Sequence, residues 1–258
     1  IPRKSSAIRS YGFYKAYQQG AEIIITIDDD CIPYEKNFVK KHERNLNQQV
    51  PNRWFPTNPL HDYWYTRGFP YTNNRKDIPV HLSHGLWTRN LDLDAPTHLF
   101  NLNSEVNYDL EYNYFIPKNY YFPLCIMNVA FSRKITPLMY MLLMGYDYKL
   151  NYFGFERFDD IWAGIIAKKV MDHLGLGVIS GSPILEHQKA SNPFDNLKKE
   201  AVGIKYNEFF WKIIDEIKLT KSSILDSYKE IARKAKFPRE DYFDKLRKAM
   251  LEWSELFD

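Results

Sequence analysis

The segment Glu22-Ile23-Ile24-Ile25-Thr26-Ile27-Asp28-Asp29-Asp30 decides the fold of this chain, because a β-branched apolar run ends there in three consecutive aspartates. A short, nearly continuous apolar run is typical of a buried strand in a sheet that is covered on both faces. The preceding residues 7–19 predict a helix, capped by Ser5 or Ser6 and ended by Gly20. A helix, a buried strand and an acidic cluster in this order indicate an α/β fold.

The rest of the chain divides into further expected elements. We expect helices at residues 37–48, 137–144 and 159–174, and strands at residues 126–131 and 176–179. Residues 51–123 are rich in Pro, Asn, Tyr and Trp without a sustained period, which predicts short strands and long loops. Amphipathic helical patterns follow at residues 206–217, 222–234 and 239–257. The chain is thus expected to form an α/β domain over residues 1–204 and a helical extension over residues 205–258, packed on the sheet or on a second subunit.

Fewer elements are expected before the acidic cluster than a nucleotide-binding sheet usually has. Such sheets usually place strand–helix–strand units before the strand that carries the acidic cluster, whereas here one expected helix precedes it. We therefore expect a sheet that lacks its first strands, which another chain could supply.

Composition narrows the class of protein. The 258 residues are 45% hydrophobic, which is enough for a substantial core, and the formal net charge of +3 argues against a surface for nucleic acid. Two cysteines, Cys31 and Cys125, fit a reducing compartment better than a disulfide scaffold. No apolar run reaches the ~18 residues of a membrane span, and no signal peptide opens the chain. We expect a cytoplasmic protein, held peripherally at the Golgi if the source is eukaryotic.

The three aspartates are the sharpest candidate for chemistry. Asp28, Asp29 and Asp30 repel one another, and at the end of a buried strand their charges are costly without a cation. Mn²⁺ or Mg²⁺ prefers oxygen ligands and keeps coordination positions open for a diphosphate. The sequence therefore predicts a divalent metal site, and the alternative is a solvated acidic turn.

Two histidine patterns give different predictions. His187 follows an expected strand and a Gly181-Ser182-Pro183 turn, so it could reach the same metal from the opposite side, or it could be an ordinary core or surface histidine. His81 and His84 have the spacing of a zinc pair, but no third ligand lies at the expected distance along the chain, so we do not expect zinc there.

Polar residues at an expected helix start and in an expected loop are further candidates. Asp159 and Asp160 either offset the dipole of the helix that they begin, or bind sugar hydroxyls and act as a general base. A polar loop contains Lys189, Ser191, Asn192, Lys198 and Lys199, and it could hold phosphate oxygens or simply lead into the helical extension. Gly175-Leu176-Gly177 lacks a third glycine and precedes a strand, so a flavin or nicotinamide cofactor is not expected.

Several segments, in order from residue 4 to about residue 200, form a distinctive set. They are Lys4-Ser5-Ser6-Ala7, Thr26-Ile27-Asp28-Asp29-Asp30-Cys31, Arg67-Gly68-Phe69-Pro70, Ser83-His84-Gly85-Leu86-Trp87, Asp92-Leu93-Asp94-Ala95-Pro96-Thr97, Phe122-Pro123-Leu124-Cys125, Met127-Asn128, Arg157-Phe158-Asp159-Asp160-Ile161-Trp162-Ala163-Gly164, Asp172-His173-Leu174-Gly175-Leu176-Gly177-Val178, Lys189-Ala190-Ser191-Asn192-Pro193-Phe194 and Asn196-Leu197-Lys198-Lys199-Glu200. Together these segments resemble the reversibly glycosylated polypeptides, a family that includes the UDP-arabinopyranose mutases.

The resemblance implies a GT-A-like, Rossmann-like nucleotide-sugar domain, Mn²⁺ or Mg²⁺ on the aspartates with His187 as a further ligand, and UDP-sugar substrates. It implies that Arg67 is the arginine that becomes reversibly glycosylated. A second family arginine, a few residues later, has no clean counterpart, because Asn74 holds the ungapped position and Arg75 lies one residue beyond. The expected substrate-binding residues are Asp28, Ser83, His84, Trp87, Asn128, Trp162, Lys189, Ser191 and Asn192.

Three functions follow from this resemblance. The first is a mutase that interconverts the pyranose and furanose forms of a UDP-sugar, with Arg67, Asp159 and Asp160 as catalytic residues. The second is a glycosyltransferase that passes the sugar to a glycan or protein acceptor. The third is a non-catalytic subunit that pairs with a complete relative, and in each case a homo- or hetero-oligomer with related chains is expected.

Overall fold

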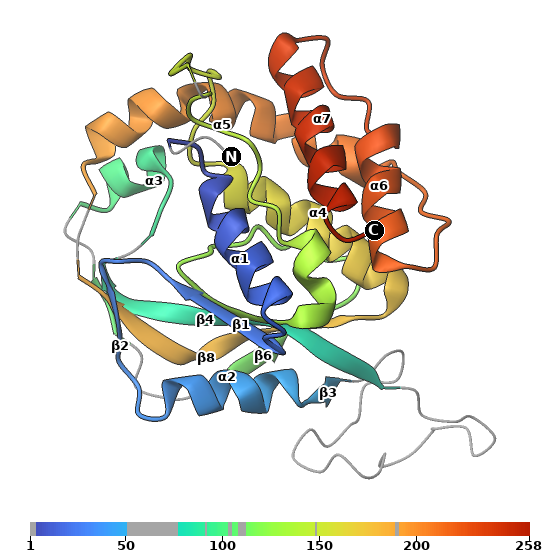
Figure 1. Cartoon of the computed structure of the whole chain (residues 1–258). Coiled ribbons are helices and arrows are strands. Elements are labelled where there is room, and N and C mark those ends of the chain that lie inside the picture. Colours follow the sequence, from blue (N-terminus) through green and yellow to red (C-terminus); the bar gives the residue numbers. More distant parts are fainter. Residues whose placement is uncertain are drawn as a thin grey trace, which may run out of the picture.

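The computed structural model describes residues 4–50, 77–90, 92–102, 105–107, 112–147, 149–188 and 191–258. They form a mixed β-sheet with helices on both faces (Figure 1). This arrangement confirms the α/β, GT-A-like fold that the sequence predicts. Within these residues, no helix combines the length and the apolar character that crossing a membrane requires.

The main sheet follows the order β1-β7-β4-β8-β2. Its strands are β1 (Ile23–Ile27), β7 (Asn128–Ser132), β4 (Ile78–Asn90), β8 (Gly177–His187) and β2 (Cys31–Pro33). Shorter strands pair at its margins, namely β3 (Gln49–Val50) and β5 (Glu105–Val106) with β4, and β6 (Asn113–Phe115) with β8. The central pair β4 and β8 is parallel and the other pairs are antiparallel. The sheet is therefore mixed, with the predicted strand β1 at one edge.

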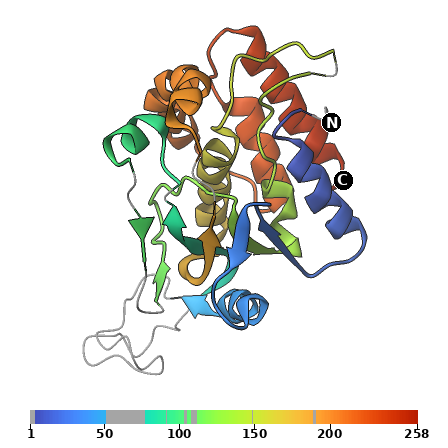
Figure 2. The ribbon, with the colours of Figure 1, turned by 90° about the vertical axis from the view of Figure 1, so that its left-hand side faces the viewer.

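Helices cover the two faces unequally. The helices are α1 (Ile8–Gln18), α2 (Phe38–Leu46), α3 (Ala95–Phe100), α4 (Asp159–Leu174), α5 (Pro193–Asp215), α6 (Ile224–Lys234) and α7 (Asp241–Glu255), with the 3-10 helix η1 (Arg133–Leu138). One face of the sheet carries α2, whereas α1, α4 and the carboxyl-terminal helices lie on the other side (Figures 1 and 2). The predicted helix over residues 159–174 is confirmed, and Gly175 ends it with the left-handed φ of 68° that favours glycine.

The carboxyl-terminal helices belong to the main core. Trp162 of α4 stacks on Phe210 of α5 with ring centroids 4.2 Å apart, and the indole N–H of Trp253 donates to the backbone carbonyl of Pro137. Leu246 and Met250 of α7 are fully buried in the same apolar cluster. The helical extension thus packs on α4 and η1, and the expected boundary at residue 205 lies inside the continuous helix α5.

Three expectations about local structure are wrong. The 13-residue strand β4 is longer than the short strands expected in that segment, although β5 and β6 are short as predicted, and β8 continues through the expected Gly181-Ser182-Pro183 turn. The expected helix at residues 137–144 is replaced by η1 and an irregular segment. The reason is that two serines, one in α1 and one just before it, bind this segment. The hydroxyls of Ser10 and Ser6 accept from the backbone N–H groups of Met141 and Met144. These contacts satisfy backbone groups that helical hydrogen bonds would otherwise use.

Candidate functional site

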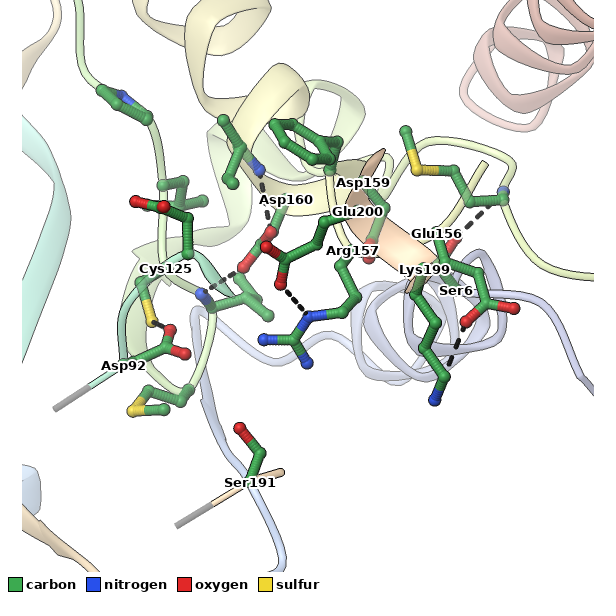
Figure 3. Close-up of a pocket in the computed structure, with 18 of the residues that line it drawn as sticks. Ser6, Asp92, Cys125, Glu156, Arg157, Asp159, Asp160, Ser191, Lys199 and Glu200 are labelled. Carbon is green, nitrogen blue, oxygen red and sulfur yellow. Dashed lines mark hydrogen bonds and ion pairs between the residues drawn. The ribbon is translucent and has the colours of Figure 1, made fainter. Parts of the chain in front are cut away.

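A cavity of about 1250 Å³ lies between the end of β1, the amino-terminal ends of α1 and α4, and one side of α5 (Figure 3). Six of the residues predicted for the site line it, namely Asp28, Asp30, Asp159, Asp160, His187 and Ser191. The cavity therefore joins the acidic end of β1 to the acidic start of α4, two segments that lie far apart along the chain.

The pairing of β2 with β8 sets one end of this cavity. Cys31 pairs with His187, and the backbone N–H of Gln188 donates to the carbonyl of Asp30. Asp30 Oδ2 consequently lies 3.7 Å from His187 Nε2. Asp28 points into the same cavity, where its Oδ1 accepts from Arg9 Nη2 at 2.5 Å. Asp29 is exposed and does not line the cavity, so two of the three aspartates face it.

The His187 ring is oriented by the backbone. Its Nδ1 lies 3.0 Å from the carbonyl oxygen of Asn90, and a carbonyl can only accept, so Nδ1 carries a proton. In the neutral ring, Nε2 then turns a lone pair toward the Asp30 carboxylate. Nε2 of His187 and Oδ2 of Asp30 therefore face each other as two acceptors 3.7 Å apart, which suits either a proton on Nε2 or a small cation between them. A metal-binding histidine commonly donates its other ring N–H to a backbone carbonyl, as Nδ1 of His187 does here.

These residues fit a divalent cation with few protein ligands. Among the described residues, no group of three or more His, Cys, Asp or Glu side chains converges on one point. Asp30 and His187 would hold the ion, and Asp28 lies in the same cavity but is bound to Arg9. Such a site leaves several coordination positions for water and substrate oxygens, as Mg²⁺ sites commonly do.

The two aspartates at the start of α4 have different surroundings. Both oxygens of Asp160 accept backbone N–H groups, from Ile126 at 3.0 Å and from Ile161 at 2.8 Å. The carboxyl of Asp159 accepts no hydrogen bond from any other described residue, and Asp159 lines the cavity. Asp160 therefore ties the start of α4 to residues 123–127, whereas Asp159 is free to meet a ligand.

Burial changes the acidity of both carboxyls. It raises the pKa of Asp160, and the neighbouring charge of Asp159 raises it further. Burial also raises the pKa of Asp159, although its own backbone N–H and the charges of Arg9 and Arg157 act against the rise. Carboxyls with raised pKa values in a cavity are suited to hold or exchange a proton near neutral pH.

Ser83 and Asn128 lie away from this cavity, in a buried polar network. Asn128 donates its amide N–H groups to the carbonyls of Leu86 and Pro183, so its Oδ1 accepts from His42 Nε2 at 3.0 Å. His42 Nδ1 then accepts from the hydroxyl of Ser83 at 2.9 Å. Asn45 also donates to that hydroxyl. This network fixes α2 to the sheet, which gives both predicted substrate residues a structural role.

The other predicted residues are distributed elsewhere. His84 is buried and contacts Ser180, and half-buried Trp87 packs in a small apolar cluster with Phe38. Trp162 is fully buried in the main core. Asn192 caps α5, because its side chain accepts from the N–H of Phe194. None of these four lines the cavity. Arg67 and Lys189 lie outside the described residues.

The cavity also contains residues for which the sequence suggested no role. They are Arg9, Asp92, Cys125, Glu156, Arg157 and Glu200, whereas Lys199, from the polar segment expected to hold phosphate oxygens, also lines the cavity. Arg157 and Glu200 stand within the segments quoted above for the family resemblance, and that is the one signal that could have drawn attention to them. Arg9 sits on a helix face with no distinguishing pattern, so its contact with Asp28 required the fold.

A mixed α/β sheet with a large acidic cavity at a strand end defines a protein of the GT-A-like nucleotide-sugar class. The family described as "Reversibly glycosylated polypeptide" matches residues 1–258, and the chain belongs to this family. UDP-arabinopyranose mutase 1 of Arabidopsis thaliana is 39% identical over 275 residues, covering 100% of this chain and 74% of the relative. Probable UDP-arabinopyranose mutase 4 of Arabidopsis thaliana is 37% identical, with 100% and 72% covered. UDP-arabinopyranose mutase 1 of Oryza sativa subsp. japonica is 36% identical, with the same coverage.

Proposed function

We propose that this protein is a metal-dependent UDP-sugar mutase that interconverts UDP-arabinopyranose and its furanose form. The names of the relatives support the substrate and the reaction. The observation that carries the proposal is the cavity, because it brings Asp30 and His187 together with the free carboxyl of Asp159. It has room for a nucleotide sugar, since its volume of about 1250 Å³ exceeds that of an ordinary ligand pocket.

Each group has a defined task in this proposal. Mn²⁺ or Mg²⁺, held by Asp30 and His187 beside Asp28, supplies stabilisation of the negative charge on the departing UDP. Asp159 binds sugar hydroxyls and exchanges a proton with them while the ring opens and closes. Arg67, from outside the described residues, captures the anomeric carbon or stabilises its positive charge. UDP leaves with the electron pair of the anomeric C–O bond, and the sugar ring then opens and closes through a different hydroxyl. The returning UDP oxygen forms a new bond to the anomeric carbon, and where Arg67 had captured that carbon, its C–N bond breaks and the electron pair returns to nitrogen.

Product analysis tests this function. The protein is incubated with UDP-arabinopyranose and Mn²⁺, with and without excess EDTA, and the nucleotide sugars are separated by chromatography. We expect UDP-arabinofuranose in the sample with metal, little in the sample with EDTA, and sugar attached to Arg67 in a peptide digest. A lack of both furanose and labelled Arg67 would rule out the mutase. Free UDP, together with label in an added acceptor, would instead identify a glycosyltransferase.

We also propose that the protein acts in the cytoplasm and assembles with related chains. Cys31 and Cys125 are both free thiols, which supports a reducing compartment. Assembly is checked by light scattering of the purified chain alone and mixed with a full-length relative, where a single-chain mass in both samples would contradict it.

A further inference from the structure

Arg157 has an unusual backbone at the edge of the cavity. Its φ of 65° lies in the left-handed region, which non-glycine residues seldom adopt. Phe155 and Phe158 on either side are buried, and Phe155 stacks on Tyr242 with ring centroids 4.0 Å apart. Because both neighbours are anchored in the core, the chain turns sharply at Arg157 and sends its side chain toward the cavity. Strained residues held by a rigid surrounding are found preferentially at functional sites.

A buried carboxylate holds one edge of the guanidinium. Arg157 Nε donates to Glu200 Oε1 at 2.6 Å, and Glu200 Oε2 accepts the backbone N–H of Ala95 at 2.6 Å. The Glu200 side chain is 3% exposed, so its position is fixed by α5 and by the start of α3. Figure 3 shows the free end of Arg157 directed into the open part of the cavity, with Ser191 beyond it.

The free end of Arg157 is available to a ligand. Nη1 and Nη2 donate to no acceptor among the described residues, and the side chain is 34% exposed. Arg9, in contrast, is bound to Asp28, Thr26 and the carbonyl of Ile126. Lys199 is a half-exposed amine 3.9 Å from Glu156. Glu200 takes Nε of Arg157, and Asp159, whose charge interacts with that of Arg157, makes no hydrogen bond with it.

We propose that Arg157, positioned by Glu200, binds the diphosphate of the nucleotide ligand through Nη1 and Nη2. This inference rests on the proposed function, since it concerns the same cavity and ligand. A planar guanidinium can donate two parallel hydrogen bonds to a phosphoryl group, and these bonds are stronger because both partners are charged. Glu200 fixes the plane of the guanidinium and leaves Nη1 and Nη2 free, so the anion meets a positively charged group in a cavity that several carboxylates line.

The test distinguishes the planar pair of donors of Arg157 from its positive charge. Arg157→Lys keeps the positive charge but removes the planar pair of donors. Arg133→Lys is the matched control, because Arg133 lies over the ring of Tyr17 and does not line the cavity. The double variant Arg157→Gln with Glu200→Gln removes both charges without leaving a buried carboxylate unpaired. Calorimetry measures the Kd values of UDP and inorganic pyrophosphate, competition NMR measures that of uridine, and circular dichroism follows folding.

We expect Arg157→Lys and the double variant to weaken binding of UDP and pyrophosphate about ten- to hundredfold, with uridine binding unchanged and Arg133→Lys like the wild type. Unchanged UDP and pyrophosphate binding, or an equal loss for uridine, would overturn the inference. If the single variant does not fold, the double variant decides. Wild-type protein that binds pyrophosphate but not UDP would refute the proposed function alone, and wild-type protein that binds neither would refute both.

Discussion

Asp159 and Asp160 are adjacent in sequence, yet the structure divides their tasks. Two backbone N–H groups occupy the oxygens of Asp160, whereas the carboxyl of Asp159 has no such donors from the rest of the described chain. The sequence left open whether the pair served helix capping or ligand binding. The geometry favours a structural role for Asp160, which ties the start of α4 to Ile126, and leaves the carboxyl of Asp159 for a ligand.

Replacing each aspartate by asparagine should separate these roles. Asp160→Asn turns an amide N–H group toward a backbone N–H group, so we expect the free energy of unfolding to fall by about 1–3 kcal/mol. Asp159→Asn should leave stability within about 0.5 kcal/mol and reduce mutase turnover at least tenfold, since a general acid–base group typically contributes more than that. Urea unfolding and the product assay measure the two effects. Equal loss of stability in both variants would contradict the division.

At the scale of single elements, α4 depends on a close contact with residues 122–124. A Cβ built on Gly164 would lie 2.4 Å from the backbone nitrogen of Leu124, a distance that requires the backbone to move. Gly12 in α1 has no atom within 4 Å of the corresponding point. The two glycines therefore stand in helices for different reasons, and Gly164 lets α4 approach the segment that lines the cavity.

Alanine substitution should reveal this difference. Gly164→Ala is expected to lower the free energy of unfolding by about 1–3 kcal/mol, because overpacking outweighs the better helix propensity of alanine. Gly12→Ala is expected to raise it by about 0.5–1 kcal/mol. Thermal and urea unfolding of the two variants measure both. A stabilised Gly164→Ala protein would show that the contact with Leu124 is not constraining.

Buried His42 of α2 and His84 of β4, with half-buried His81 of β4, predict a dependence of stability on pH. Burial lowers the pKa of His42 to about 4, and it lowers the pKa values of His81 and His84 to about 4 as well. The unfolded chain binds these protons near pH 6.5, so the stability is fully present above that pH and is lost as the pH falls toward 4. Each histidine contributes a slope of at most about 1.4 kcal/mol per pH unit in this window.

Urea unfolding at several pH values from 7.5 to 5 measures this slope. His42→Gln should reduce the dependence of the unfolding free energy on pH by the contribution of one histidine, although the variant is less stable at every pH. A free energy of unfolding that stays constant between pH 7 and pH 5 in the wild type would show that the three rings are not held neutral.

The elements also show which features the sequence could predict. β1 and α4 were predictable because their apolar pattern is uninterrupted and Gly175 marks an end. β4 was not, since Ser83 and His84 are polar residues inside a buried strand and only partners such as His42 and Ser180 make their burial favourable. Asp30 and His187 could be proposed from residue type and position. Arg157 and Glu200 meet from 43 residues apart, and no local pattern reports such a contact.

At the scale of the whole molecule, the sheet brings its acidic strand end and the start of α4 to one cavity, and the carboxyl-terminal helices fix that arrangement. Trp162, Phe210 and Leu246 belong to one apolar cluster that joins the sheet side of α4 to α5 and α7. Residues that ligands would meet, such as Asp30, Arg157 and Asp159, stand at the margin of this rigid core. The arrangement suits a site whose charged groups need little reorganisation when a ligand binds.

The central claim is that Asp30, with His187, binds a divalent cation that holds UDP in this cavity. Titration of Mn²⁺ into the protein with UDP, followed by electron paramagnetic resonance of the free ion, tests it most directly, with Asp30→Asn compared to Asp29→Asn. We expect one Mn²⁺ per chain in the wild type and at least a tenfold weaker site in Asp30→Asn. We also expect one Mn²⁺ per chain in Asp29→Asn, because Asp29 is exposed and does not line the cavity. Equal Mn²⁺ binding by all three proteins, or none by any of them, would contradict it.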